Sequence, residues 1–143
     1  MNFLLDTCVL SELRRPLPNA AVIEWFKTVA EEALFVSVVT LAELSRGIEK
    51  ARVINTAHAS RLDRWLTQIK LRFKGKTLVT DDEVWDAWAE ICGVSDASGQ
   101  PRPPIDTLLV ATAHLHGLTI VTRNVRDFAP YPLIFNPWIE SVA

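Results

Sequence analysis

The sequence predicts an α/β fold with three layers, in which a central, mainly parallel sheet carries helices on both faces. Short apolar segments rich in β-branched and aromatic residues recur along the chain, and longer segments with apolar residues at helical spacing lie between them. Strands that alternate with helices pair in parallel, because each helix returns the chain to the same end of the sheet. With 143 residues, 49% of them hydrophobic, the chain has the size and apolar content of one domain, which we expect to span residues 1–143.

Five segments have the length and composition of buried strands. Each is short and apolar, with β-branched or aromatic side chains. They are residues 2–5, 34–39, 77–80, 118–122 and 133–135.

Helical patterns fill the intervals between these strands. The first is a short helix that begins after Asp6. The last opens with two prolines, Pro103 and Pro104, and closes on Gly117, which are the preferred signals for a helix start and stop. The other patterns cover residues 20–30, 40–51, 56–73 and 80–94, and the stretch SDASGQPRPP (95–104) is a loop between two helices.

Composition and motifs exclude several classes of protein. No apolar run is long enough to cross a bilayer, and Asp6 interrupts the N-terminal apolar segment, so we expect a cytoplasmic protein with no membrane partner and no signal peptide. A glycine-rich phosphate loop and a nucleophile elbow are both missing from the sequence, which argues against NTPase and triad-hydrolase chemistry. Cys8 and Cys92 lack metal-ligand spacing and are expected to be free thiols in the core. The three histidines form no i, i+4 pair, and we interpret them as structural.

Charge is distributed unevenly along the chain, although the net charge is only −2. Residues 46–76 hold nine Lys or Arg against two acids, a local charge of +7, and residues 77–100 hold six acids and no base. The basic stretch is either a phosphate-binding surface or a set of solvated helix faces, because both produce this pattern.

Three acids, Asp6, Glu43 and Asp106, each have a structural interpretation. Asp6 can cap the short helix that follows the first strand. Glu43 forms a T-x-x-E capping box with Thr40, and Asp106 suits the positive end of a helix dipole. Considered one at a time, the three acids require no binding site.

The positions of the same acids also fit a binding site. Asp6 ends the first predicted strand, whereas Glu43 and Asp106 lie near the starts of two helices. In an open parallel sheet, ligands bind at the carboxyl ends of the strands and at the adjacent helix starts. Carboxylates that converge there repel one another, and a hard divalent cation relieves that repulsion. Helix caps and a metal site therefore both remain open.

Four longer motifs are more specific than the separate acids. They are LLDTCVLSEL, VVTLAELSRGIEKA, PPIDTLLVATAHLHGLTIVTRNVRDF and IFNPW. In their order and spacing, over nearly the whole chain, they resemble the PIN-domain ribonuclease toxins of type II toxin–antitoxin modules, the VapC and FitB-like group. The resemblance implies a PIN-like fold, a Mg²⁺- or Mn²⁺-dependent endoribonuclease, usually a homodimer, and inhibition by a cognate antitoxin protein.

The resemblance also assigns roles to individual residues. Asp6, Glu43 and Asp106 match the three acids with which the family holds metal. Thr122 matches the hydroxyl residue that follows the last central strand and helps order the site. The fourth acidic position is Asn124 here; family members vary between Asp and Asn at this point, so the function is retained, but one metal and two metals both remain open.

Two further residues near these motifs are interpreted less directly. Asp127 either supplies charge to the site through water or is an ordinary acid of a surface turn. Cys8 replaces the asparagine that usually follows Asp-Thr in the family, and we interpret it as a packing residue.

With the acids in these positions, the resemblance implies hydrolysis of RNA phosphodiester bonds by a metal-activated water, with the basic stretch holding the RNA backbone. Arg46 lies nearest to the acids in sequence, although an ion pair within its helix explains it as well. One alternative is a non-catalytic binding module in which the acids are only caps. A second is a metal-dependent nuclease that acts on DNA, or in RNA processing, without an antitoxin.

Overall fold

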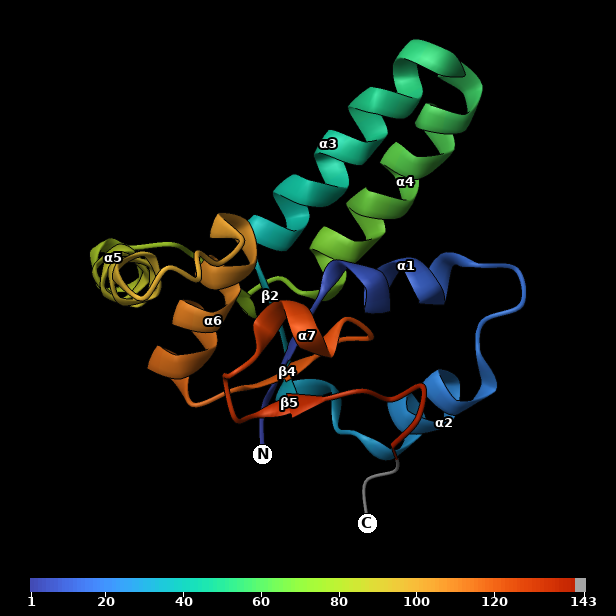
Figure 1. The fold of residues 1–143 in the computed structure, drawn as a ribbon. Coiled ribbons are helices and arrows are strands. Elements are labelled where there is room, and N and C mark those ends of the chain that lie inside the picture. Colours follow the sequence, from blue (N-terminus) through green and yellow to red (C-terminus); the bar gives the residue numbers. More distant parts are fainter. Residues whose placement is uncertain (141–143) are drawn as a thin grey trace.

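The computed structural model describes residues 1–140 and confirms the predicted α/β architecture, with one sheet of parallel strands (Figure 1). The strand order is β3–β2–β1–β4–β5, and every neighbouring pair is parallel. Each strand lies within a predicted segment and is shorter than that segment. The strands are β1 (Phe3–Leu5), β2 (Leu34–Ser37), β3 (Thr77–Leu78), β4 (Thr119–Val121) and β5 (Ile134–Phe135).

The helices agree with the predicted patterns except for the shortest elements. The predicted set appears as α1 (Thr7–Arg14), α2 (Ala20–Thr28), α3 (Val38–Ile54), α4 (Thr56–Arg72), α5 (Asp82–Ala97) and α6 (Pro104–His116). The 3₁₀ turn Glu31–Ala33 and helix α7 (Val125–Phe128) were not predicted, because three and four residues are too few to display a helical period. Within residues 1–140, no helix combines the length and the apolar character that crossing a membrane requires.

The sheet separates two hydrophobic cores. Phe3 and Leu5 of β1 face a core that α1, α2, α3 and α4 complete, whereas Leu4 between them faces a core built mainly with α5, α6 and α7. In β4, Val121 and Ile120 divide in the same way. This division is the two-residue period of a strand, and it explains why both faces of the sheet carry helices.

Helices α3 and α4 form a hairpin that projects from the body of the molecule (Figure 1). Asn55 joins them: its side-chain oxygen accepts a hydrogen bond from the His58 N–H at 3.1 Å and so caps α4. Arg52 of α3 donates to Asp63 of α4 at 2.8 Å and also pairs with Glu49 on its own helix. Part of the basic stretch predicted to hold RNA is therefore neutralised within the hairpin.

The predicted cap of α3 is wrong. Helix α3 begins directly after β2, and Ser37 is its N-cap, because the Ser37 hydroxyl accepts a hydrogen bond from the Val39 N–H at 3.0 Å. Thr40 therefore lies inside the helix, and its buried hydroxyl has no hydrogen-bond partner within residues 1–140. The capping box that offered a structural explanation for Glu43 does not form.

Candidate active site

Asp6 is held at the carboxyl end of β1 by hydrogen bonds to its backbone and to its carboxylate. Its backbone N–H donates to the Val121 carbonyl of β4 at 3.0 Å. One carboxylate oxygen accepts from the Thr7 N–H at 2.7 Å, which caps α1 as the sequence suggested, and the other accepts from the Thr122 hydroxyl at 2.8 Å. Asp6 is buried, and burial, opposed by these hydrogen bonds, raises the pKa of its carboxyl group.

Glu43 belongs to the second turn of α3 and is held from α1. The Thr7 hydroxyl donates to the Glu43 carboxylate at 3.2 Å, which links residues 36 positions apart in the sequence. Partial burial and the nearby charge of Asp6 raise the pKa of Glu43, whereas the Thr7 hydrogen bond and the charge of Arg46 lower it. Sequence reasoning missed Thr7, because only the folded chain brings α1 against α3.

Asp106 lies in the first turn of α6 and is half-buried, with no hydrogen bond from its carboxylate to any side chain or backbone group of the described residues. Burial is the largest cause of its raised pKa, which reaches about 6. The charges of Asp127, Asp6 and Glu43 raise it further, in that order. The carboxylates of Asp127, Asp6 and Glu43 therefore all lie within electrostatic range of Asp106, at the carboxyl ends of the strands.

The donor chemistry of this acid cluster, which we define as Asp6, Glu43, Asp106 and Asp127, fits a hard divalent cation. Its carboxyl groups repel one another. In the described part of the chain, Arg46 is the one base whose charge opposes the raised pKa of any of the acids Asp6, Glu43 and Asp106, and it acts on Glu43. Oxygen ligands with unbalanced negative charge are what Mg²⁺ and Mn²⁺ require. Among residues 1–140, however, no three His, Cys, Asp or Glu side chains already stand close enough to form a finished coordination shell. The cluster thus has the charge for a metal, and waters would have to complete the ligand set.

Thr122 and Asn124 lie directly after β4, beside the acids. The Thr122 side chain is fully buried, and besides donating to Asp6 it accepts a hydrogen bond from the Asn124 N–H at 3.0 Å. The Asn124 side chain makes no hydrogen bond within the described residues, although the residue is the N-cap of α7. The structure therefore shows how Thr122 orients Asp6, and it leaves the Asn124 amide group available to a ligand.

Cys8 and Asp127 also lie closer to the acids than the sequence indicated. The Cys8 side chain packs against the first core, as predicted, but its sulfur is also 3.6 Å from both an Asp6 carboxylate oxygen and the Thr122 hydroxyl. Asp127 is exposed on α7, yet its charge is the largest electrostatic contribution to the raised pKa of Asp106. Of the two interpretations of Asp127, the electrostatic one has support in the structure.

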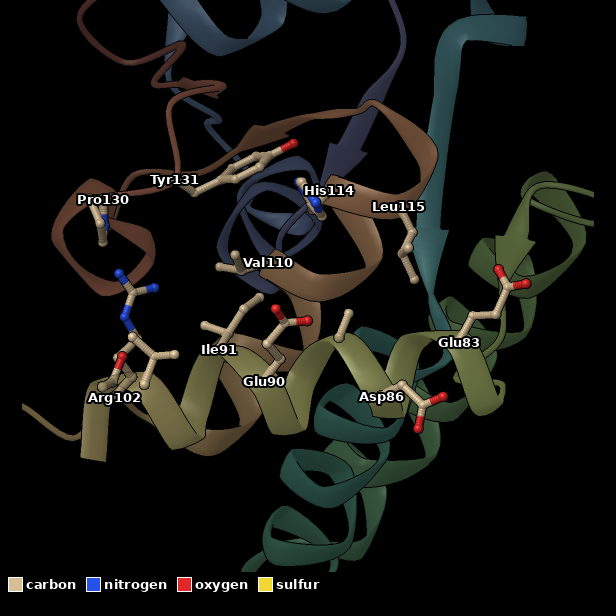
Figure 2. A pocket seen from close by; sticks show the side chains of 13 residues that line it. Glu83, Asp86, Glu90, Ile91, Arg102, Val110, His114, Leu115, Pro130 and Tyr131 are labelled. Carbon is tan, nitrogen blue, oxygen red and sulfur yellow. The ribbon is translucent and has the colours of Figure 1, made fainter. Parts of the chain in front are cut away.

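A second concavity lies away from the acid cluster. Its volume is about 690 Å³, and Figure 2 shows that side chains of α5 and α6 line it, together with Pro130 and Tyr131. Three acids of α5 line it, Glu83, Asp86 and Glu90, together with apolar side chains of both helices. None of the residues predicted for the active site borders this groove.

Comparisons with known proteins agree with the fold. The PIN-domain family model matches residues 3–131. The toxin FitB of Neisseria gonorrhoeae is 36% identical over 94% of this chain and 97% of its own length, and the VapC ribonuclease Y4jK of Sinorhizobium fredii is 31% identical over 94% and 96%. The crystal structure of FitAcB from Neisseria gonorrhoeae aligns with a TM-score of 0.85 at 34% identity, covering 96% of this chain and 99% of that chain. The chain belongs to the PIN-domain family.

Proposed function

We propose that this chain is an endoribonuclease that acts as the toxin of a type II toxin–antitoxin module. Relatives that align over nearly their whole length are named a toxin and a ribonuclease. The observation that carries the proposal is the acid cluster at the carboxyl ends of β1 and β4, in which the charges of Asp6, Glu43 and Asp127 all act on Asp106. Such an arrangement costs stability unless a cation binds there.

Asp6, Glu43 and Asp106 would hold Mg²⁺ or Mn²⁺, and Asn124 would contribute its side-chain oxygen. When bound, the cation supplies the positive charge that activates water and offsets negative charge on the phosphate undergoing hydrolysis. The Thr122 hydroxyl fixes one oxygen of Asp6, and the Thr7 hydroxyl fixes the Glu43 carboxylate. Both hydroxyls therefore act as positioning groups, because they set the direction in which each carboxylate faces.

The chain's basic side chains supply the affinity for RNA that an acidic pocket lacks. Arg46 carries its charge near Glu43 without forming an ion pair within residues 1–140, so it remains available to a phosphate. Arg72 is less available, because it donates to Glu31 at 2.7 Å. We expect two protein partners for such a toxin: a cognate antitoxin, and a second copy of the chain with which it forms a homodimer.

Mapping of RNA 5′ ends after brief induction tests the proposal. The intact protein should create new 5′ ends, and the Asp6→Ala variant, expressed to the same level, should not. Asp82→Asn is a matched control, since Asp82 is an acid in the first turn of α5 outside the acid cluster, and it should cleave as the intact protein does. Equal cleavage by Asp6→Ala would reject the site assignment, and cleavage without a growth defect would indicate a PIN-domain nuclease with a role in RNA processing instead.

A further inference from the structure

Arg123 lies two residues beyond the end of β4, next to the acid cluster, and its backbone is fixed there. Its N–H donates to the sulfur of Cys8 at 3.4 Å. The residues on either side are bound as well, since Thr122 donates to Asp6 at 2.8 Å and the Asn124 N–H donates to Thr122 at 3.0 Å. The Arg123 side chain consequently leaves the backbone at the rim of the acid cluster.

The guanidinium of Arg123 is exposed and has no acidic partner among residues 1–140. Instead it lies over the indole ring of Trp138, with its central carbon 5.5 Å from the ring centroid. A planar guanidinium that stacks on an aromatic ring keeps its N–H groups free at the edges. Those edges suit two oxygens of a phosphate, which a guanidinium binds as a fork.

Trp138 is itself held in place, so the ring can act as a platform. Its backbone N–H donates to the buried side chain of Asn136 at 3.0 Å, and the ring packs against the first core. The platform therefore joins the C-terminal FNPW segment to the first core.

An arginine at this position offsets negative charge beside the acid cluster. The cluster repels RNA phosphates, and on the α3 side Arg46 offsets part of that charge. On the β4 side, Arg123 is the arginine that adjoins Thr122 and Asn124 in the chain. A strand of RNA that crosses the carboxyl ends of the strands would pass between the two arginines.

We propose that Arg123, held on the ring of Trp138, binds a backbone phosphate of the substrate RNA beside the acid cluster, and that Trp138 is a positioning residue for it. The inference rests on the proposed ribonuclease function and names a specific substrate contact for it.

Binding and cleavage of a fluorescein-labelled single-stranded RNA test the contact separately. Affinity is measured by fluorescence polarisation in EDTA over a series of salt concentrations, and kcat and KM are measured with Mn²⁺. We expect Arg123→Gln to weaken binding by about tenfold, to reduce the salt slope by about one, and to raise KM with kcat nearly unchanged. Arg123→Lys should keep the salt slope but bind several-fold more weakly, because an ammonium group neither stacks nor binds as a fork.

Variants of the platform distinguish positioning from folding. Trp138→Phe retains a ring and should stay close to the intact protein, whereas Trp138→Leu should raise KM in the same direction as Arg123→Gln. Arg14→Gln is the matched control, because Arg14 stacks on Trp65 at 5.8 Å in the same manner and carries no ion pair within residues 1–140. Thermal unfolding of every variant shows whether the fold is intact.

The outcomes separate the two proposals. If the intact protein cleaves RNA and Arg123→Gln has an unchanged KM and salt slope, or loses no more affinity than Arg14→Gln, the contact is refuted and the ribonuclease function stands. If the intact protein neither binds nor cleaves RNA, both proposals are refuted.

Discussion

Neutralising Asp106 should stabilise the metal-free protein, and the effect should depend on pH. The pKa of this carboxyl rises from 3.8 to about 6 on folding, so the folded state binds more protons than the unfolded state between these values. A raised carboxyl pKa contributes stability at pH below 3.8, and that contribution is lost as the pH rises through 6. Above pH 6 the protein therefore carries the full cost of a charged Asp106.

The size of this cost follows from the pKa difference, reduced for exposure. A pKa difference of about two units corresponds to a free-energy cost of about 3 kcal/mol. Solvent screening of a half-buried group reduces this cost to about 1–2 kcal/mol. The charge also has a favourable contact with the dipole of α6, of about 0.3–1 kcal/mol, which an amide loses. Asp106→Asn should thus raise the free energy of unfolding by about 1 kcal/mol at pH 8 and by little at pH 4.

Urea unfolding in EDTA, followed by tryptophan fluorescence from pH 4 to pH 8, measures this difference. Asp82→Asn serves as the control, because Asp82 occupies the first turn of α5 but lies outside the acid cluster, and its substitution should give no gain. Addition of Mn²⁺ should reverse the order, since the intact protein binds the ion and the Asn variant binds it more weakly. The reasoning fails if Asp106→Asn is no more stable than the intact protein at pH 8, or if its gain is the same at every pH.

The residue at position 124 affects how many metal ions the site can hold. Asn124→Asp should strengthen binding of Mn²⁺ more than binding of Mg²⁺ and should retain RNA cleavage. Unchanged metal affinities in calorimetry would place this residue outside the metal's surroundings. Ser37→Ala should lower the free energy of unfolding by about 1 kcal/mol, because it removes the cap of α3. Thr40→Val should leave that free energy unchanged or raise it, because the Thr40 hydroxyl has no hydrogen-bond partner within residues 1–140. If urea unfolding shows Thr40→Val to be the less stable variant, Thr40 is the cap after all. Asp127→Asn should lower the pKa of Asp106, because it removes the like charge that contributes most to raising that pKa; an unchanged titration midpoint of the Asp106 carboxyl carbon in NMR would contradict this link.

The sequence was sufficient for the strands and for most of the helices because their signals are local. Each strand is a short, apolar segment that helices cover on both faces, so its composition differs from that of its flanks. The meeting of Asp6 and Asp106 was also predictable, because the carboxyl ends of parallel strands lie at one edge of the sheet. Their electrostatic coupling in the structure agrees with that rule.

Contacts between distant segments could not be predicted in this way. The hydrogen bond from Thr7 to Glu43 depends on how α1 packs against α3, and no periodicity records that packing. The same holds for Arg123 and Trp138, which two loops bring together. The error at Thr40 has a different origin: Ser37 and Thr40 are both good caps, and only the end of β2 decides which of them is used.

The two outer strands of the sheet, β3 and β5, are only two residues long. An edge this short offers little unpaired backbone to an incoming strand, so the sheet is a poor template for cross-β growth at high protein concentration. Partners that attach by adding a strand are disfavoured for the same reason. Association with other chains should therefore proceed through helix surfaces and side chains, which leaves the backbone ladder of the sheet unchanged when a partner binds or dissociates.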